Sequence, residues 1–408
     1  MKICIVSYGG YPTLSGYGGI ALYSQVAARA LAARGHEVHV IACYAHEYVD
    51  GGQVHKDVHY EATDGTIQLH ARSMYPLPIV ERWLEGLGAS LSLARSLREL
   101  HRQHHFDVVE FPNYEGLGFV SCLLRIAPIV VRLHTSTYEH IQILGRPARR
   151  AERFLMWLEK QSVRLARGVV THSLAQRDKL APVYGLPDVP VIPHAVELPA
   201  TASYDPAKRQ KAVLIVGGLN ARKGLTTLLT AIPIVLAAVP DAEFWLTGGG
   251  ANSSHELQFR QQHPEIPAHR VKFLGFVSVA ELADLYRTCA LHASASVHES
   301  FGLTLVEAMA HATPVVACNA SATPEIVHHD KTGLLVLPND PTAFAAAIIR
   351  LLQNSSLSRR LGETGRQVAE SAYAPSRLGE RLESFFGHIN GRQVTPTERE
   401  KLQIGIES

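Results

Sequence analysis

The sequence predicts an α/β protein with two Rossmann-like domains whose parallel sheets face each other across a cleft. Residues 2–7 form a short apolar strand that is followed by a glycine-rich loop and a helix over 20–34, and residues 213–218 begin the same pattern again. Continuous apolar strands alternate with helical segments in both halves, which is typical of parallel sheets covered on both faces. The 408 residues also exceed what one hydrophobic core usually supports.

The predicted elements follow this plan along the chain. Further strands of the first half are expected near 38–42, 107–111, 129–133 and 168–172. Those of the second half are expected near 243–247, 271–274, 290–294, 313–317 and 334–336. The predicted organisation is an acceptor-binding domain over 1–195, a donor-binding domain over 196–371, a helix at about 372–390 that crosses back to the first domain, and an unstructured polar tail over 391–408.

Composition excludes several classes of protein. The formal charge of +2, from 39 basic and 37 acidic residues, is far from the basic excess of a nucleic-acid binder. The longest apolar stretches fall short of a membrane span, and the first residues lack the features of a signal peptide, so a cytosolic protein is expected. Met156 and Trp157 lie near a basic stripe of the predicted helix 149–167, which leaves membrane contact open as the less favoured interpretation. The oligomeric state is not indicated.

The cysteines and histidines do not form a recognisable metal or disulfide pattern. The five cysteines have no paired spacing and lie in apolar runs, which favours reduced core thiols. The 22 histidines include His101, His104 and His105 in a polar stretch without a compatible set of carboxylates, so surface histidines are expected and no metal site is predicted.

The glycines of the first half do not fit a dinucleotide site. Gly16 to Ala21 form an imperfect GxGxxG string that begins eight residues after the strand, and the second strand does not end in an acidic residue. The sequence also lacks a GxxxxGK[ST] phosphate-binding loop. A glycine-rich loop near the cleft, suited to another ligand, remains the better interpretation.

The stretch 298–310 carries the strongest chemical signal. Ser300, Phe301 and Gly302 precede a helix whose free backbone amides and dipole favour an anion, and two carboxylates, Glu299 and Glu307, flank that point. Carboxylates accept hydrogen bonds from hydroxyl groups, so a ligand with phosphate between two polyols fits. Taken residue by residue, Glu307 is better explained as a helix-forming residue on a solvated face.

This stretch resembles the E-x7-E motif of the retaining GT-B glycosyltransferases of family 4, a group that includes glycogen-synthase-like and mannosyltransferase-like enzymes. Other matches occur in family order, and the resemblance covers roughly residues 1–390. These further matches are Gly18-Gly19, 34–38, 192–196, Lys223-Gly224, 273–277, 324–327 and 332–336. The resemblance implies a GT-B fold and the transfer of a hexose or modified hexose from a nucleotide-diphosphate sugar to a hydroxyl group of a glycan, a glycolipid precursor or a small-molecule glycoside.

The resemblance also implies roles for individual residues. Lys223 would neutralise the diphosphate, Glu299 would lie beside the sugar, Glu307 would hold the ribose hydroxyls, and His134 would lie near the reacting sugar. The full set expected to bind the donor is Gly18, Gly19, Gly218, Arg222, Lys223, Gly275, Phe276, Glu299, Ser300, Phe301, Gly302, Leu303 and Glu307. The residues expected to contact the acceptor, on position alone, are Tyr17, Asn113, Tyr114 and Glu115.

The expected chemistry retains the anomeric configuration without an enzyme nucleophile, because the departing diphosphate deprotonates the acceptor on the same face. A double displacement would need a carboxylate on the opposite face, for which Glu110, Glu115 and Glu139 are the only candidates. No cofactor is expected. Metal independence is expected because the sequence has no Asp-x-Asp pair.

The sequence departs from the family pattern at the diphosphate. Gly217-Gly218-Leu219 stands where the family usually has Gly-Arg-Leu, so a second cation is missing unless Arg222 replaces it. Two other functions therefore stay open. One is a nucleotide-sugar epimerase on the same fold, and the other is a non-catalytic protein that binds nucleotide sugars.

Overall fold

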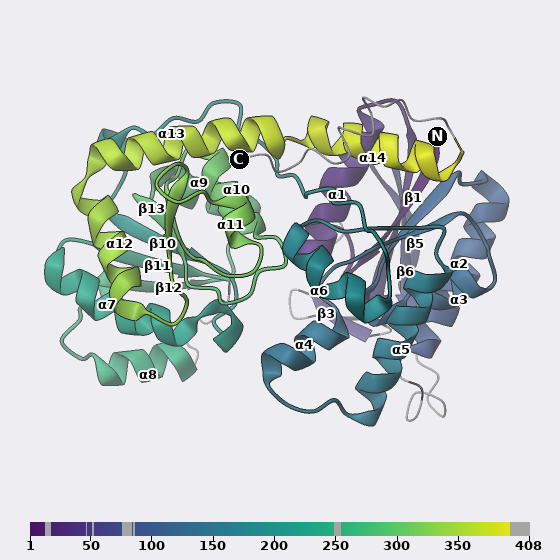
Figure 1. Ribbon diagram of the computed structural model, residues 1–408, viewed down its shortest axis with the longest axis horizontal. Coiled ribbons are helices and arrows are strands. Elements are labelled where there is room, and N and C mark those ends of the chain that lie inside the picture. The colour runs from purple at the N-terminus through teal and green to yellow at the C-terminus, as the bar shows by residue number, and fades with distance from the viewer. Residues whose placement is uncertain are drawn as a thin grey trace. The chain divides into compact units, whose positions relative to one another are not determined.

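The computed structural model describes residues 1–12, 18–45, 47–50, 53–75, 84, 86–248 and 254–391, with only the backbone described at 47–50 and 53–56. The chain divides into two compact units, each with its own sheet (Figure 1). Unit 1 comprises Met1–Ala195 together with the chain from Pro375, and unit 2 comprises Val196–Ala374.

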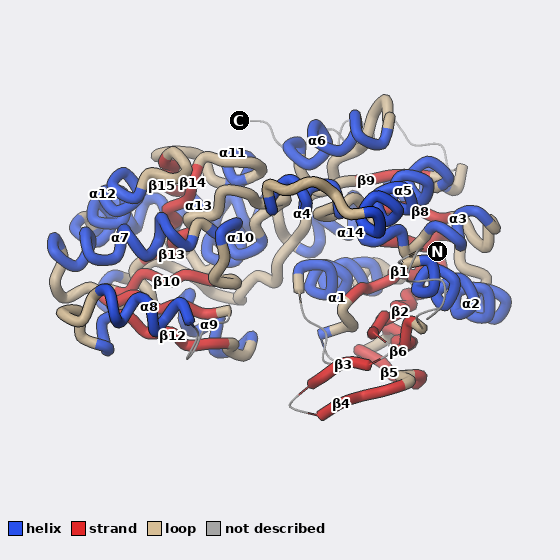
Figure 2. Tube along the Cα trace, turned by 90° about the horizontal axis from the view of Figure 1, so that it is seen from below, coloured by secondary structure: helices blue, strands red, loops and turns tan. Residues whose placement is uncertain are grey.

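The sheet of unit 1 has seven strands in the order β5-β6-β2-β1-β7-β8-β9. All neighbouring strands are parallel except β5, which runs antiparallel to β6. A separate antiparallel hairpin, β3–β4, projects from this unit (Figure 2). The strands are β1 (Lys2–Tyr8), β2 (Glu37–Ala45), β3 (Glu47–Asp50), β4 (Gln53–Lys56), β5 (His59–Asp64), β6 (Ile67–Met74), β7 (Val108–Pro112), β8 (Ile129–Arg132) and β9 (Gly168–Val170).

Four strands of unit 1 were not expected from the sequence. The strands predicted near 38–42, 107–111, 129–133 and 168–172 are present as β2, β7, β8 and β9, whereas β3 to β6 are additional. β6 pairs with β2 along nearly its whole length. It escaped prediction because polar residues, His70, Arg72 and Ser73, occupy buried positions in it and break the apolar pattern of a strand.

The sheet of unit 2 is wholly parallel and has six strands in the order β12-β11-β10-β13-β14-β15. Every strand predicted for the second half is present, with ends shifted by at most two residues. The strands are β10 (Ala212–Val216), β11 (Glu243–Thr247), β12 (Val271–Gly275), β13 (Leu291–Ser294), β14 (Val315–Cys318) and β15 (Gly333–Val336).

Each sheet is buried on both faces by helices. In β1, Ile3 and Ile5 enter one core, while Cys4 and Val6 enter the core on the other face, because side chains of a strand alternate between faces. The helices of unit 1 are α1 (Gly19–Ala32), α2 (Leu87–His104), α3 (Phe119–Leu123), α4 (Thr137–Leu144), α5 (Arg150–Leu165), α6 (Leu174–Tyr184) and α14 (Pro375–Ile389). Those of unit 2 are α7 (Leu225–Ala238), α8 (Ser254–Gln262), α9 (Val279–Thr288), α10 (Leu303–Ala310), α11 (Thr323–Ile326), α12 (Pro341–Gln353) and α13 (Ser355–Ala372).

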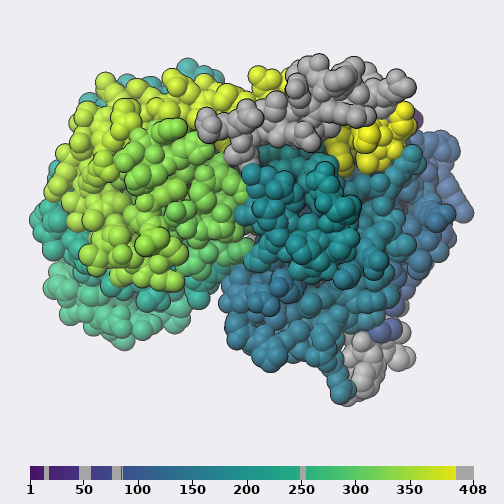
Figure 3. Space-filling model, viewed as in Figure 1, coloured from purple at the N-terminus to yellow at the C-terminus, as the bar shows by residue number. Residues whose placement is uncertain are grey.

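α12 and α13 form part of the outer surface of unit 2 (Figure 3). All five cysteines are buried and free, as expected for core thiols. Within the described part of the chain, no helix is both long enough and apolar enough to cross a membrane.

The last described helix, α14, completes the core of unit 1. It packs beside α1 (Figure 1), and its buried side chains join the core that contains Ile3 and Ile5. Gly379 allows the two helices to come close, since a Cβ there would lie 2.9 Å from the carbonyl oxygen of Ala30. The Arg34 Nε donates a hydrogen bond of 2.6 Å to Glu383 at the edge of this contact.

Two glycines of unit 1 provide a test of its packing. Gly116 and Gly145 have similar positive φ values of 66° and 61°, but a Cβ at Gly116 would lie 2.8 Å from the backbone carbon of Leu158, whereas nothing lies within 4 Å at Gly145. We expect Gly145→Ala to cost about 1 kcal/mol of stability through backbone strain, and Gly116→Ala to cost about 2–4 kcal/mol because α5 must also shift. Chemical denaturation of both variants measures the difference, and equal losses would contradict this packing.

Candidate active site

In unit 2, two of the charged residues expected at the donor, Lys223 and Glu299, lie in loops that follow neighbouring strands. Lys223 ends the short 3-10 turn η4 (Ala221–Lys223), which comes after β10, and Glu299 lies in the loop that follows β13. The turn is capped by Asn220, whose side-chain oxygen accepts a hydrogen bond of 3.2 Å from the Lys223 backbone amide. The carboxyl ends of adjacent parallel strands meet at one edge of the sheet, which brings the two loops together.

A glycine fixes one loop against the other. Gly224 has φ +66°, and a Cβ there would lie only 1.9 Å from the carbonyl oxygen of Ala295. The backbone amide of Val297 donates a hydrogen bond of 3.0 Å to the carbonyl oxygen of Arg222. The two backbones are therefore locked in register, and the side chain of Lys223 meets that of Glu299.

Two cations approach the carboxylate of Glu299. The Lys223 Nζ lies 2.5 Å from Glu299 Oε1, and the Arg222 Nη1 lies 4.0 Å from Oε2 while donating to the carbonyl oxygen of His298 at 3.1 Å. Burial alone would raise the pKa of Glu299, but the Lys223 ammonium and hydrogen bonds from Lys223 and Ser296 lower it below its usual value. One carboxylate facing two cations leaves a local excess of positive charge, which favours an anion.

The start of α10 lies directly after Glu299. Gly302 precedes the helix with φ +110°, and no side chain caps it, so the first turn presents its backbone amides. Phe301 is buried and packs edge-to-face on Tyr373 with ring centroids 5.8 Å apart. Ser321 Oγ also anchors this loop, because it donates a hydrogen bond of 2.8 Å to the carbonyl oxygen of Glu299. Ser300 and Leu303 lie on either side of these anchored residues.

Glu307 lies one turn into α10 and is half-buried. Burial raises the pKa of its carboxyl group, and the hydroxyl of Tyr286 donates a hydrogen bond of 3.0 Å to its Oε2. Tyr286 comes from α9 and is itself buried. The carboxylate is thus held by a tertiary contact, unlike a residue on a fully solvated helix face.

The remaining donor candidates of unit 2 lie near the same strand ends. Gly217 has φ +128°, and a Cβ there would lie 3.5 Å from Lys223 Cε; its neighbour Gly218 is exposed. The carbonyl oxygen of Gly275 accepts hydrogen bonds from Thr247 Oγ1 at 3.0 Å and from the Gly248 amide at 2.9 Å. Phe276, which follows, is 87% exposed and can stack on a planar ring.

In unit 1, the candidates also follow the carboxyl ends of strands. His134 lies two residues after β8, and Asn113 follows β7. The backbone amide of His134 donates a hydrogen bond of 2.7 Å to Asn113 Oδ1. Burial lowers the pKa of His134 well below its usual value, and His172 and Arg132 lower it further, so the imidazole is neutral. Asn113 is fully buried, so its side chain positions the His134 loop.

The other predicted residues of unit 1 lie in the segment after β7 and at the start of α1. Tyr114 packs on Tyr8 with ring centroids 4.5 Å apart, and the Glu115 amide donates 3.1 Å to the buried Glu159. Gly18 has φ +97° and precedes α1 without a side-chain cap, with Gly19 exposed beside it. Tyr17 lies outside the described residues.

Two of the three carboxylates considered as nucleophiles, Glu110 and Glu139, have structural partners. Glu110 accepts from Arg132 Nε at 3.1 Å and from the Tyr23 hydroxyl at 2.6 Å, and all three are buried. Glu139 is buried and forms the capping box of α4 with Ser136. Neither arrangement resembles an exposed nucleophile.

Four residues that contact candidate site residues were not predicted from the sequence. Asn220 could have been found, because Asn before a turn is a common capping residue, but Ser296, Tyr286 and Glu159 act through tertiary contacts that carry no local signal.

Comparisons with known proteins agree with this architecture. Residues 17–199 match the family model Glycosyltransferase Family 4, and residues 210–354 match the model Glycosyl transferases group 1. A phosphatidyl-myo-inositol mannosyltransferase from Mycobacterium leprae is 31% identical over 278 residues, which make up 64% of this chain and 68% of that protein.

Solved structures share the fold over nearly the whole chain. Sucrose-phosphate synthase from Thermosynechococcus elongatus has a TM-score of 0.76 at 23% identity, and the superposition covers 96% of this chain and 100% of that chain. The Anabaena protein HepE, in complex with UDP-glucose, has a TM-score of 0.68 at 18% identity, with 95% and 100% covered. With two α/β units, family models that match one half each, and a relative of this similarity, the chain belongs to the family 4 glycosyltransferases and has the GT-B fold.

Proposed function

We propose that this chain transfers a hexose or modified hexose from a nucleotide-diphosphate sugar to a hydroxyl group, with retention of the anomeric configuration. Membership in the glycosyltransferase family supports sugar transfer. The observation that carries the choice of donor is the meeting of Lys223, Arg222 and Glu299 at the start of α10. HepE, which shares the fold, was solved with UDP-glucose.

The diphosphate would bind where positive charge exceeds negative charge. A phosphate oxygen competes with Glu299 for the Lys223 ammonium, and the amides at the start of α10 donate hydrogen bonds to the anion. Arg222 supplies the second cation, because its guanidinium already faces the same carboxylate as Lys223. It thereby takes the place of the arginine that the family usually has at the position of Gly218.

The two ends of the donor would bind to carboxylates. Glu307, held by Tyr286, accepts hydrogen bonds from the ribose hydroxyls, and Glu299 accepts them from the sugar. The exposed ring of Phe276 stacks on the base, while the carbonyl oxygen of Gly275 is already used within the protein.

In the transfer step, the bond between the anomeric carbon and the diphosphate oxygen breaks, and the bond to the acceptor oxygen forms on the same face. The acceptor proton passes to the departing diphosphate oxygen, so no enzyme nucleophile and no metal ion is required. Lys223 stabilises the negative charge that develops on the leaving group. By the family resemblance, the neutral imidazole of His134 would lie close to the sugar, and Glu115 and Tyr114 would contact the acceptor, which is a glycan, a glycolipid precursor or a small-molecule glycoside.

We expect Lys223→Ala to lower kcat about 100-fold or more, since removal of one preorganised donor to a developing charge costs about 3 kcal/mol. The same variant should bind UDP, GDP, ADP or TDP more weakly while its affinity for the parent nucleoside stays unchanged. Thermal shift with a panel of nucleosides and nucleoside diphosphates measures this difference.

Two variants control for the Lys223→Ala experiment. Lys208→Ala removes a lysine of the same unit whose side chain is 83% exposed, and it should behave as the original protein. Lys223→Arg retains the charge and should recover part of the rate. If Lys223→Ala lowered activity but still bound nucleoside diphosphates as tightly as the original protein does, the role given to Lys223 would be contradicted.

We expect Glu307→Gln to raise the donor KM and leave kcat nearly unchanged, because a contact to ribose is equally strong in the ground state and the transition state. Glu307→Gln should not weaken the binding of a 2′,3′-dideoxy nucleoside diphosphate, because that nucleotide lacks the ribose hydroxyls. Binding constants for both nucleotides in both proteins form a double-mutant cycle. An equal loss with both nucleotides would place Glu307 away from the ribose.

With an α-linked donor, we expect an α-linked product, and the anomeric proton coupling in an NMR spectrum reports it. A β-linked product would overturn retention. Conversion of the donor sugar without any acceptor would favour an epimerase, and donor binding without turnover over a broad acceptor panel would favour a binding protein.

A further inference from the structure

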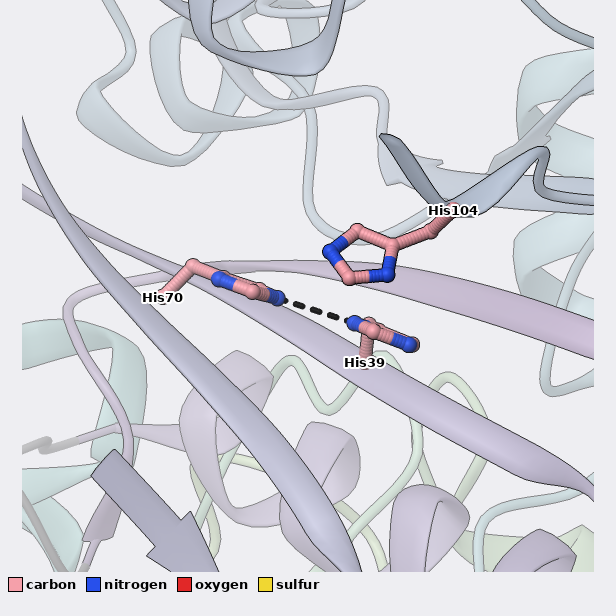
Figure 4. A group of neighbouring side chains, drawn as sticks. All are labelled: His39, His70 and His104. Carbon is pink, nitrogen blue, oxygen red and sulfur yellow. Dashed lines mark hydrogen bonds between the residues drawn. The ribbon is translucent and has the colours of Figure 1, made fainter. Parts of the chain in front are cut away.

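Three histidines from separate elements of unit 1 meet at the face of the sheet that α2 covers (Figure 4). His39 belongs to β2, His70 to the neighbouring strand β6, and His104 is the last residue of α2. Each offers one ring nitrogen, and these three nitrogens lie within 4.8 Å of one another. The group contains two buried histidines and one half-buried histidine.

The backbone explains why the rings converge. β2 and β6 are paired in parallel with Ile41 opposite His70, so His39 and His70 point to the same face as Ile41 and Cys43, which belong to the core beneath α2. The rings of His39 and His70 are nearly parallel, with an interplanar angle of 2°. The ring of His104 reaches them from the end of α2, with its centroid 4.3 Å from that of His39.

Carboxylates hold the outer nitrogens of the two buried rings. Glu37 Oε1 lies 3.2 Å from Nε2 of His39. Glu61 Oε2 lies in ion-pair contact with Nδ1 of His70, while Glu61 Oε1 accepts a hydrogen bond of 2.5 Å from Arg72 Nη2. The remaining nitrogens, His39 Nδ1 and His70 Nε2, form a hydrogen bond of 2.9 Å with each other (Figure 4). A carboxylate on the far nitrogen of an imidazole is the usual support of a histidine that binds a metal ion.

We propose that His39, His70 and His104 bind one Zn²⁺ ion. Three imidazole ligands with a fourth position for water is an established coordination for zinc, with Zn–N distances of about 2.0–2.1 Å. Two such ligands in a tetrahedron lie about 3.3 Å apart. Zinc binding would break the hydrogen bond of 2.9 Å between His39 Nδ1 and His70 Nε2 and release the proton that the two nitrogens share, and these nitrogens would move apart by about 0.4 Å.

The ion would join three elements and take no part in sugar transfer. His39 lies near the amino end of β2, whereas the candidate site residues of unit 1 follow the carboxyl ends of their strands. Zinc would bind the end of α2 to β2 and β6, and its binding energy would add to the stability of unit 1. The expectation that transfer needs no metal concerns a different part of the molecule.

The full chain, stripped of metal with EDTA, tests the proposal by titration with ZnCl₂ against a chromophoric chelator. We expect one equivalent of Zn²⁺ to bind with a dissociation constant below about 1 µM and to raise the melting temperature. Co²⁺ should give the intense visible absorption of a tetrahedral site. His104→Ala should weaken binding at least 10-fold, while His105→Ala, its exposed neighbour, should bind as the original chain does.

Two outcomes would overturn the proposal. One is a chain that binds no Zn²⁺ at micromolar concentration. The other is a His104→Ala variant that binds as tightly as the original while His172→Ala does not, because a second buried group, His134, His172 and His194, would then be the site. Far-ultraviolet circular dichroism in EDTA confirms that the His104→Ala variant is folded, which the position of His104 at a helix end favours.

Discussion

Both sheets are covered by helices on both faces, and this constraint decides where polar side chains can act. In β1, successive residues enter opposite cores, so the middle of such a strand offers no exposed face. The candidate site residues therefore lie beyond strand ends: His134 after β8, Lys223 after β10 and Glu299 after β13. The same crowding explains Gly224, where even a methyl group would collide with the next loop.

The sequence predicted the elements that obey this constraint and missed those that break it. Every strand of unit 2 is a short apolar run, and the pattern located each one. β6 contains buried polar residues such as His70 and Arg72, whose burial is compensated by partners in β2 and β5 that no local pattern reveals. Strands made of apolar runs and strands with buried, paired polar residues are stabilised differently. Only the apolar strands have a pattern that can be recognised in the sequence.

The candidate site shows the same division. The glycines, Lys223 and Glu299 were identified from local motifs, but the ion pair between them joins residues 76 positions apart and depends on the contact of Gly224 with Ala295. The direction of Arg222 could not be derived either, since neighbouring residues often point apart. In a chain with a net charge of only +2, the proposed recognition of an anionic donor would rest on this local pair of cations.

The place of α14 has a consequence for how the chain is made. Its buried side chains, including Leu378 and Phe386, complete a core whose other members lie among the first 195 residues. A ribosome releases residues in order, so one face of the sheet in unit 1, which α1 also packs against, stays incompletely covered while the whole of unit 2 is synthesised. Unit 2 can reach its native state first, and the N-terminal half is the last to mature.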